Sequence, residues 1–325
     1  MSQPTVVVTG AAGFIGARFV ESCNRRRIPV VSVDDPEFFA SRPEHRGLDF
    51  GDVVAPADIA GWLGSAVPPR GIVHLGACTD TTELDVDYLN RVNLEASQVL
   101  WNYGAAHDVP LVYASSAATY GGGELGYDDD PAKFGELRPL NPYGDSKLQF
   151  DVWALERHAA GDHPPAWSGF KFFNVYGFGE RHKGRMASVV LQAFDQIRAS
   201  GSVKLFRSHR DGIADGEQKR DFIHVDDVVD VLWFALEKPI ESGVFNLGTG
   251  RARTFLDLVR AVFAALDVPE DVVFIDTPED IRERYQYFTE ATMDRLRAQG
   301  YSKPFTSLED GVRAYVGRLL EAAQS

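Results

Sequence analysis

The sequence predicts an α/β protein in which helices cover both faces of a doubly wound parallel sheet. Two patterns carry this prediction. Short apolar, β-branched runs alternate with amphipathic stretches through the first half of the chain, which is typical of repeated βαβ units. The first apolar run also passes through a glycine-rich turn directly into a helical stretch. The first strand–turn–helix unit of a dinucleotide-binding sheet has this arrangement.

The predicted strands are short and recur at regular intervals. They are residues 5–9, 29–33, 71–75, 111–114 and 169–174, with amphipathic helices predicted between them at 15–25 and 86–106. Runs such as VVVTG and LVYAS are apolar almost throughout, as strands buried on both faces are. We therefore expect one parallel sheet of the Rossmann type.

After about residue 175 this alternation ends, and we expect a second domain. Helices are predicted at 187–199, 221–239, 256–265 and 308–322, a polar stretch at 207–219, and a strand ending in a glycine turn at 244–250. The expected nucleotide-binding domain comprises 1–175 plus approximately 221–249. The expected substrate domain is a smaller α/β unit comprising approximately 176–220 plus 250–325.

Composition narrows the class of protein. A net charge of −14 over 325 residues argues against a general nucleic-acid or membrane-surface binder, because those carry basic stripes. We find no apolar run of about 18 residues and no signal-peptide pattern, so we expect a cytoplasmic protein. Cys23 and Cys78 lie in unrelated segments, and no HExxH or CxxC pattern occurs. We therefore predict free thiols and no metal site.

The glycine turn predicts a dinucleotide site. Gly10, Gly13 and Gly16 follow the first strand in a GxxGxxG spacing, with Phe14 and Ile15 opening the helix. Glycine lets backbone N–H groups approach a pyrophosphate, and the helix N-terminus presents its positive dipole end to that anion. An ordinary strand-to-helix loop also contains glycines, but the strand, the helix and a following acid together favour nucleotide binding.

The following acid is Asp34, at the end of the second predicted strand. A carboxylate there can accept hydrogen bonds from the adenosine ribose. Asp34 and Asp35 favour NAD, whereas Arg42 and Arg46 can fold back to pair a 2′-phosphate, so NAD and NADP both stay open. Asp52 is a candidate adenine contact or, alternatively, an acid of a surface turn.

Two further segments predict chemistry. The run YASSAATYG, which contains Ser116, follows a buried strand, and YGDSK places Tyr143 and Lys147 four residues apart on one helical face. A phenol is a poor base at neutral pH, because its pKa is about 10. A nearby ammonium and a positive nicotinamide ring can lower that pKa, while Ser116 holds the substrate oxygen.

These motifs, in this order, resemble the extended short-chain dehydrogenase/reductase superfamily over nearly the whole chain. Ser116, Tyr143 and Lys147 match its triad. Within this superfamily, the chain is similar to the ADP-L-glycero-D-manno-heptose 6-epimerase family. The similarity lies in the runs FFNVYGFGERHKGRMASV, QKRDFIHVDDV, VFNLGTGRA, ERYQYFTEA and LRAQGYSKPF. The HKG-x-MAS and RYQ-x-FT elements are the most specific of these.

The resemblance implies an isomerase that acts on ADP-D-glycero-D-manno-heptose for lipopolysaccharide core synthesis. C6 is oxidised to a ketone, and the hydride returns to the opposite face. Lys183 matches the family's second base on that face, although a phosphate or ribose contact is an alternative role. The resemblance also implies a tightly bound NAD or NADP and a homo-oligomer, commonly a pentamer.

Further binding residues follow from the same resemblance. Beside the glycine turn, Asp34, Tyr143 and Lys147, the cofactor is expected to contact Gly76, Ala77, Thr79, Asn93 and Val175. Beside Ser116 and Lys183, the substrate is expected to contact Asn174, Arg185, Gln192, Phe206, Arg207, Ser208, Arg220 and Tyr285. The chain departs from the family pattern at Arg185, where a small hydroxyl residue is usual, at Gln192, where histidine is usual, and in a longer 207–216 stretch.

Two alternatives stay open. Another sugar-nucleotide 4-epimerase or a dehydratase of the same superfamily uses one tyrosine base and does not need Lys183. A non-catalytic nucleotide-binding sensor or scaffold is a different class of protein, but such proteins usually lose the tyrosine or the lysine, and both are present here.

Overall fold

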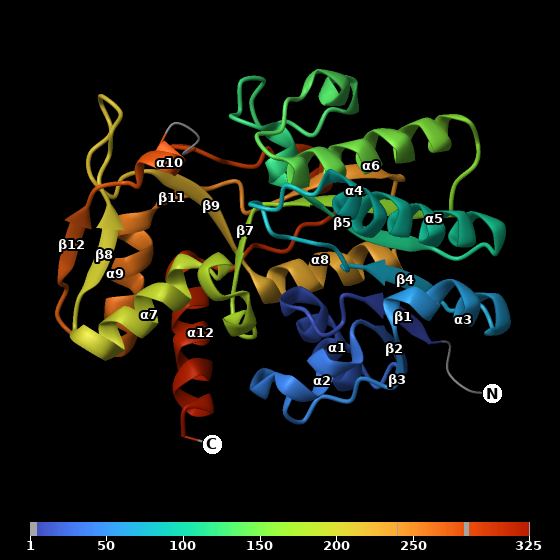
Figure 1. Cartoon of the computed structure of the whole chain (residues 1–325), viewed down its shortest axis with the longest axis horizontal. Helices are drawn as coiled ribbons and strands as arrows, with labels where there is room; N and C mark the ends of the chain where they lie inside the picture. Colours follow the sequence, from blue (N-terminus) through green and yellow to red (C-terminus); the bar gives the residue numbers. More distant parts are fainter. Residues whose placement is uncertain (1–4, 239, 283–285, 325) are drawn as a thin grey trace.

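The computed structural model of the chain describes residues 5–238, 240–282 and 286–324. Its largest element is a seven-stranded sheet in the order β10-β6-β5-β4-β1-β2-β3 (Figure 1). The strands are β1 (Val6–Thr9), β2 (Val30–Val33), β3 (Asp52–Val54), β4 (Gly71–His74), β5 (Leu111–Ser116), β6 (Trp167–Phe172) and β10 (Gly243–Leu247). All neighbouring strands pair in parallel, which confirms the predicted Rossmann-type sheet.

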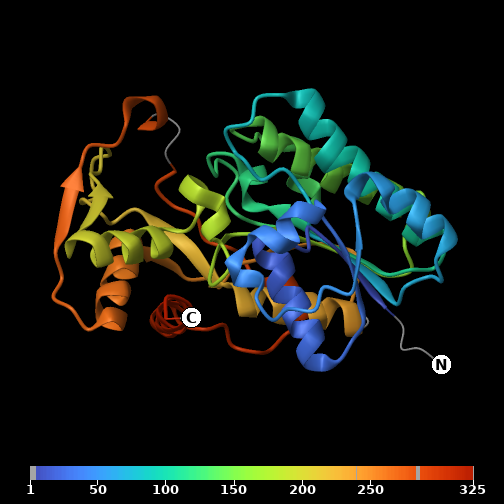
Figure 2. The ribbon, with the colours of Figure 1, turned by 60° about the horizontal axis from the view of Figure 1, so that its bottom comes forward.

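Helices cover both faces of this sheet (Figures 1 and 2). Helices α1 (Phe14–Arg26) and α8 (Val225–Glu237) pack against each other on one face. Helices α3 (Ile59–Ser65), α5 (Ala96–Ala106) and α6 (Pro142–Ala159) cover the other face. Short helices α2 (Pro36–Ser41), α4 (Val86–Leu89) and α11 (Asp294–Ala298) complete this part of the molecule, and a π-helical turn (Asn90–Glu95) joins α4 to α5.

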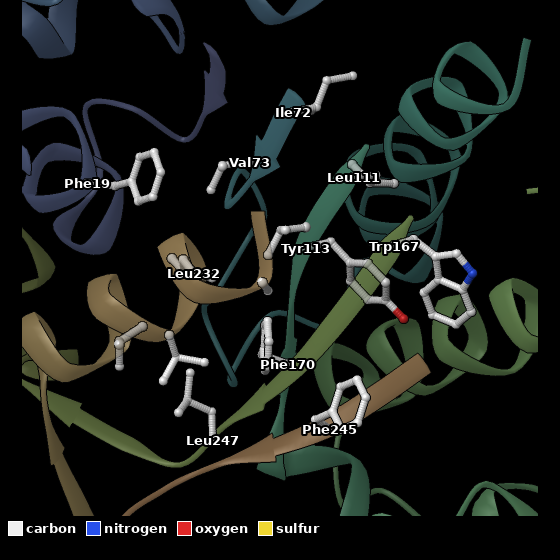
Figure 3. Close-up of a cluster of buried hydrophobic side chains, with 14 of the residues drawn as sticks. Phe19, Ile72, Val73, Leu111, Tyr113, Trp167, Phe170, Leu232, Phe245 and Leu247 are labelled. Atoms are coloured by element: carbon white, nitrogen blue, oxygen red, sulfur yellow. The ribbon is translucent and has the colours of Figure 1, made fainter. Parts of the chain in front are cut away.

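The core of this layered unit lies between the sheet and its helices. Figure 3 shows Val73 and Phe170 on the face of the sheet that Phe19 of α1 and Leu232 of α8 cover, whereas Leu111 points to the opposite face. All five side chains are buried. Apolar side chains on both faces of each strand explain why the strand sequences are apolar almost throughout.

A second, smaller core lies beside the first one. A three-stranded sheet β11-β9-β7 and a two-stranded sheet β12-β8 surround it, with helices α7, α9 and α12. The bounds are β7 (Asn174–Tyr176), β8 (Val203–Phe206), β9 (Lys219–His224), β11 (Ala252–Thr254), β12 (Val272–Ile275), α7 (Val189–Ser200), α9 (Phe255–Leu266), α10 (Glu279–Arg282) and α12 (Leu308–Ala322). The two cores support a division into two domains, whose boundaries stay a prediction.

The structure differs from the sequence predictions at one helix and at several short strands. The helix expected over 221–239 begins at Val225, because the preceding residues form β9 and pair with β7 and β11. The imidazole of His224 caps that helix by accepting from the amide of Asp226 at 3.4 Å. Strands β3, β8 and β12 were not expected, since their three or four residues carry too little periodic signal.

The sheet order locates the site. The chain runs outward from β1 to β2 and β3, and then returns to place β4 on the other side of β1. Ligands of such sheets bind at the carboxyl edge where this order reverses. Among the described residues, no helix has both the length and the apolar character needed to cross a bilayer.

Candidate active site

The glycine turn lies at the carboxyl end of β1, at this switch point. Gly10 has φ +65°, and a Cβ on it would lie 2.7 Å from the amide nitrogen of Gly76, so only glycine fits there. A Cβ on Gly16 would collide with the carbonyl oxygen of Gly10. Gly13 is the N-cap of α1, which begins at Phe14. Two strand ends and a helix N-terminus therefore meet with bare backbone between them, which fits a dinucleotide pyrophosphate.

Asp34 lies beside this turn. Its Oδ2 accepts from the amide of Ala12 at 3.0 Å, and its Oδ1 accepts from the amide of Asp35 at 2.9 Å. Burial raises the pKa of Asp34, while those amides and the nearby Arg42 guanidinium oppose the shift. Arg42 donates to the carbonyl oxygen of Ala12. An acid and a guanidinium thus flank the same turn, while the exposed Asp35 caps α2 through the amide of Glu37.

Asp52 lies elsewhere. It opens β3 opposite Val31, whereas the edge that carries Asp34 is reached at Val54, at the other end of the strand. Asp52 is exposed there. The parallel register thus places Asp52 two residues before the end of β3, and its adenine contact stays a prediction.

Arg42 gives a first testable prediction. We expect Arg42→Ala to weaken NADPH binding about 10-fold, or about 1.4 kcal/mol, because a guanidinium pairs strongly with a phosphate. NADH lacks the 2′-phosphate and should lose less than about threefold. Fluorescence titration of nucleotide-free protein with both cofactors measures this difference, with Arg25→Ala, at an exposed position late in α1, as the control. Equal losses for both cofactors would contradict a phosphate-selective role.

The loop after β4 lies beside the glycine turn. The amide of Gly76 donates to Thr9 Oγ1 at 3.0 Å, and Ala77 and Thr79 follow along the same edge. Asn93 was expected to line the cofactor, but its side chain is wholly buried behind this loop. It accepts from the amide of Cys78 at 2.8 Å and donates to the Cys78 carbonyl at 3.1 Å. Asn93 therefore fixes the loop, a different role from the direct contact expected.

Tyr143 and Lys147 lie in the first turns of α6. Asn141 caps this helix by accepting from the amide of Gly144 at 2.8 Å, and Pro142 occupies its first position. Tyr143 and Lys147 are only 8% and 5% exposed. Lys147 Nζ donates to the carbonyl oxygen of Ala114 on β5 at 3.1 Å. The motif thus places both functional groups at the inner surface of α6, against the end of β5.

Ser116 is the last residue of β5. Its Oγ accepts from the amide of Ala118 at 3.1 Å and so starts the 3-10 turn that ends the strand. The Ser116 side chain also hydrogen-bonds with the Tyr143 side chain, which lowers the pKa of that phenol. The structure therefore brings Ser116, Tyr143 and Lys147 together at one strand end.

The electrostatics of this trio differ from the expectation in one respect. Burial is the largest influence on Tyr143 and raises the pKa of its phenol above the usual value. Burial lowers the pKa of Lys147 to about 8, and the Asp151 carboxylate opposes that change. In the protein without bound molecules, burial thus outweighs the Ser116 hydrogen bond, and Tyr143 is a neutral phenol near pH 7.

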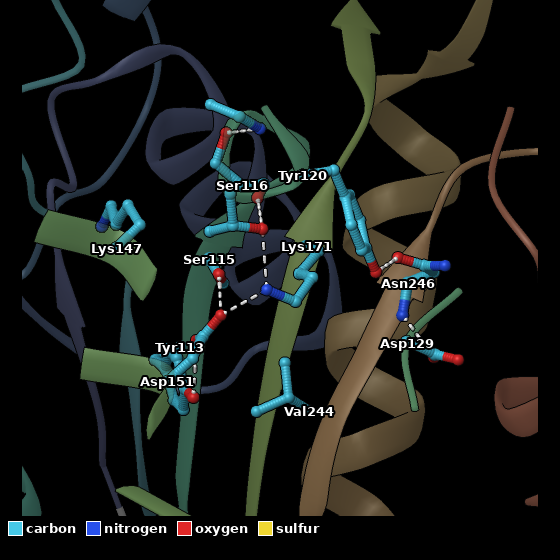
Figure 4. Close-up of polar contacts among 12 residues, drawn as sticks. Tyr113, Ser115, Ser116, Tyr120, Asp129, Lys147, Asp151, Lys171, Val244 and Asn246 are labelled. Atoms are coloured by element: carbon cyan, nitrogen blue, oxygen red, sulfur yellow. Dashed lines mark hydrogen bonds and ion pairs between the residues drawn. The ribbon is translucent and has the colours of Figure 1, made fainter. Parts of the chain in front are cut away.

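A buried ion pair supports this strand end (Figure 4). Lys171 Nζ on β6 and Asp151 Oδ2 on α6 lie 2.7 Å apart, and both side chains are wholly buried. Asp151 also accepts from the Tyr113 hydroxyl at 3.0 Å and from Ser115 Oγ at 2.7 Å, both on β5. One carboxylate thus joins α6 to two strands, β5 and β6.

The ammonium side of the pair reaches the Ser116 turn. Lys171 Nζ donates to Thr119 Oγ1 at 2.7 Å, and Thr119 Oγ1 donates to the carbonyl oxygen of Ser116 at 2.8 Å. The aromatic faces of Phe134 and Tyr120 lie 4.2 and 5.1 Å from Nζ, where a ring attracts a cation. The pair therefore fixes the backbone of the strand end as well as the helix.

Lys183 lies across the glycine turn from the sheet. It belongs to the 3-10 turns Arg181–Met186, which Gly184 breaks with φ +53°. Its Nζ lies 5.4 Å from the ring centre of Phe14, at the start of α1. Glu180 Oε2 lies 3.9 Å from Nζ. Burial lowers the pKa of Lys183, and the Glu180 carboxylate opposes this shift. The structure thus brings Lys183 beside the start of α1, next to the glycine turn.

Arg185 and Gln192, the two positions that depart from the family pattern, make hydrogen bonds that hold the turns Arg181–Met186, called here the Lys183 segment. Arg185 donates to Thr82 Oγ1, in the loop after β4, at 2.7 Å. Gln192 of α7 donates to the carbonyl oxygens of Ala187 and Arg185 at 2.9 and 3.2 Å. Both residues therefore join the segment to its surroundings in the protein, beside the substrate contacts expected of them.

The other expected substrate residues lie in the smaller core unit. Asn174 opens β7, with Val175 after it, and Asn174 is exposed. Phe206, Arg207 and Ser208 lie where β8 ends. The buried Arg220 of β9 donates to the carbonyl oxygens of Lys219 and Gln286. Tyr285 lies outside the described residues.

The sequence interpretation did not identify Asp151, Lys171 or Glu180. Asp151 follows Lys147 by four residues, so helical spacing places it on the face of Tyr143. Glu180 precedes Lys183 by three residues in a glycine-rich turn. Lys171 carried no comparable local signal, because strand pairing alone brings it to Asp151.

Comparisons with known proteins agree with this site. The model of the NAD dependent epimerase/dehydratase family matches residues 6–248. The ADP-L-glycero-D-manno-heptose-6-epimerase of Fusobacterium nucleatum subsp. nucleatum is 44% identical, over 98% of this chain and 99% of that protein. The crystal structure of the Helicobacter pylori ADP-L-glycero-D-manno-heptose-6-epimerase aligns with a TM-score of 0.82 at 27% identity, over 98% of this chain and 96% of that one.

A further solved structure is MoeE5 in complex with UDP-glucuronic acid and NAD. It aligns with a TM-score of 0.73 at 27% identity, over 98% of this chain and 99% of that one. The family match covers the sheet, the glycine turn and the Ser116–Tyr143–Lys147 site, and the relatives match the chain over nearly its whole length. This chain therefore belongs to the NAD-dependent epimerase/dehydratase family and, within it, to the ADP-L-glycero-D-manno-heptose-6-epimerases.

Proposed function

We propose that this enzyme converts ADP-D-glycero-D-manno-heptose to ADP-L-glycero-D-manno-heptose by inverting C6. The observation that supports this proposal is the placement of two proton-transfer candidates next to the glycine-turn end of the sheet: Tyr143 lies beside Ser116 at the end of β5, and Lys183 lies beside Phe14 at the start of α1. The near-full-length similarity to a Fusobacterium epimerase supports the choice of substrate. The product would supply heptose for the lipopolysaccharide core.

The protein's own groups provide the first half of the chemistry. Tyr143 accepts the proton of the C6 hydroxyl, and the Ser116 hydroxyl hydrogen-bonds to the same oxygen as charge develops. The Lys147 ammonium stabilises the phenolate. NAD or NADP, held by the glycine turn and Asp34, supplies when bound the acceptor for the C6 hydride and a positive charge. Because the hydride returns in the same turnover, the cofactor is expected to stay bound.

Lys183 provides the second half. Inversion requires the hydride to reach the other face of the ketone, and the oxygen must then receive its proton at a different position. A lysine can donate that proton when its pKa approaches neutrality. Burial acts on Lys183 in this direction. We therefore propose Lys183 as the second acid and base.

The remaining binding roles are part of the same proposal. The cofactor contacts are Gly10, Gly13, Phe14, Ile15, Gly16, Asp34, Asp35, Gly76, Ala77, Thr79 and Val175. The substrate contacts are Asn174, Arg185, Gln192, Phe206, Arg207, Ser208 and Arg220, with the Arg220 guanidinium on the diphosphate. We also propose a cytoplasmic homo-oligomer, specifically a pentamer, which sedimentation analysis of the purified protein tests.

Incubation with ADP-D-glycero-D-manno-heptose tests the function directly. We expect a mixture of both C6 epimers, resolved by chromatography or NMR, since equal masses hide the reaction from mass spectrometry. UDP-glucose serves as the comparison substrate. Conversion of UDP-glucose to its C4 epimer, with no reaction of the heptose, would replace this proposal with a 4-epimerase. No turnover of either substrate would favour a non-catalytic nucleotide-binding protein.

Lys183 separates the two enzymatic alternatives. We expect Lys183→Ala to lower the epimerisation rate about 10²-fold or more, because proton transfer by a positioned group contributes about 10²–10⁴-fold. Lys204→Ala, on the exposed side of β8, is the control and should keep the wild-type rate. Full activity of Lys183→Ala would indicate a single-base mechanism.

A further inference from the structure

Glu180 is a wholly buried carboxylate beside the proposed second base. Such a group requires specific partners, since burying an unpaired charge is costly. Two of them come from Ser188, just before α7: its hydroxyl donates to Oε1 at 2.5 Å and its amide donates to Oε2 at 2.7 Å. These bonds hold the carboxylate in one orientation.

Lys183 is another neighbour of this carboxylate. The distance of 3.9 Å between Glu180 Oε2 and Lys183 Nζ is an ion-pair distance but too long for a hydrogen bond. The Lys183 side chain is 27% exposed, whereas that of Glu180 is fully covered. Burial raises the pKa of the Glu180 carboxyl, while the Lys183 ammonium and the Ser188 donors oppose this shift and favour the carboxylate. Lys183 is a partly accessible cation next to it.

The proposed reaction requires Lys183 to start with a proton. In the D-to-L direction, the proton of the C6 hydroxyl goes to the Tyr143 oxygen and the hydride goes to the cofactor. When that hydride returns to C6, a proton moves from Lys183 Nζ to the carbonyl oxygen, so Tyr143 ends protonated and Lys183 ends neutral. Burial favours neutral Lys183 from the beginning and so opposes this direction.

We propose, on the basis of the function proposed above, that Glu180 is a positioning residue that keeps Lys183 protonated for its role as the second acid. A fixed negative charge 3.9 Å away favours the ammonium form. At this distance Glu180 attracts Lys183 without accepting a close hydrogen bond from it. The ammonium thus keeps its protons available for a substrate oxygen.

Other titratable groups around this pair act differently. Tyr315, on α12, faces Glu180, and burial followed by that carboxylate raises the pKa of its phenol, so Tyr315 stays neutral. His182 precedes Lys183, and burial lowers the pKa of His182 to about 4, with smaller effects from Arg42 and Glu44. His182 is therefore neutral near pH 7. Among these groups, Glu180 supplies the charge that favours protonated Lys183.

Glu180→Gln tests this inference, because it keeps the shape and removes the charge. Trace labelling with acetic anhydride between pH 6 and 11, followed by peptide mass spectrometry, gives the pKa of Lys183 without any turnover. We expect this pKa to fall by about one unit or more, since an opposite charge at this distance shifts a pKa by about 1–3 units. The limb of the epimerisation pH profile that reports Lys183 should move by the same amount toward lower pH.

Asp195→Asn is the matched control. Asp195 pairs with Arg181 of the same segment at 2.9 Å, but both side chains are half exposed. Its removal should leave the Lys183 pKa unchanged. Glu180→Asp, which draws the carboxylate back by one methylene, should give an intermediate fall and serves if the glutamine variant does not fold. An unchanged Lys183 pKa in the Glu180 variants would overturn the inference, whereas a wild-type protein without epimerase activity would overturn only the proposed function.

Discussion

Tyr143→Phe should lower the rate of epimerisation by about 10²–10⁴-fold, the contribution of a positioned general base. Phenylalanine fills the same buried space at the start of α6 but has no oxygen to receive the proton of the C6 hydroxyl. The variant should keep its bound nicotinamide, because the glycine turn and Asp34 are untouched. Epimer formation measured by NMR, together with the absorbance of the bound cofactor, separates lost chemistry from lost binding.

Tyr103→Phe is the matched control for this loss. Tyr103 lies on α5, where its ring stacks against His107 with a centroid distance of 4.4 Å. Removing its hydroxyl should leave the rate within about twofold of the wild type, as for a substitution away from the chemistry. A Tyr143→Phe protein that retained more than a tenth of the wild-type rate would remove Tyr143 from the proposed mechanism.

The Asp151–Lys171 pair carries the second large expected effect. Lys171→Met should lower the free energy of unfolding by about 3–5 kcal/mol, because it leaves a buried carboxylate without its cation. The Tyr113 and Ser115 hydroxyls remain as donors to Asp151 but carry no charge. Burial lowers the pKa of Lys171, so the cation also depends on the carboxylate. Guanidinium denaturation followed by circular dichroism measures the loss.

The double variant Asp151→Asn with Lys171→Met distinguishes an ion pair from two independent contacts. Removing both charges together should restore about 2 kcal/mol relative to Lys171→Met alone, because no unpaired buried charge remains. Asp195→Asn, in an ion pair that is half exposed on both sides, should cost less than about 1 kcal/mol. Strict additivity of the two buried substitutions would show that the charges do not interact.

Much of the site follows from local patterns in the sequence. The glycine spacing, the four-residue interval between Tyr143 and Lys147, and the end of the strand at Ser116 each depend on a few neighbouring residues. Local geometry then fixes where these side chains point, and parallel pairing brings the strand ends to one edge. For this reason the sheet, the turn and the trio were predictable together.

The remaining features depend on pairings between distant segments. The register of β3 against β2 places Asp52 opposite Val31, and a sequence pattern does not fix such a register. Asn93 carries an amide that suits a ligand equally well, but tertiary packing turns it toward Cys78. The partnership of Lys171 with Asp151 likewise arises only when β6 lies beside β5. These are contacts that local periodicity does not encode.

Transfer of a C6 deuterium tests the central claim most directly. ADP-D-glycero-D-manno-heptose carrying deuterium at C6 is incubated with the enzyme in ordinary water, and the L epimer is analysed by NMR. We expect the product to retain deuterium at C6, because the hydride leaves and returns through the same bound nicotinamide within one turnover. A product with hydrogen at C6 would show that the carbon exchanges its proton with water, and it would contradict inversion by transient oxidation.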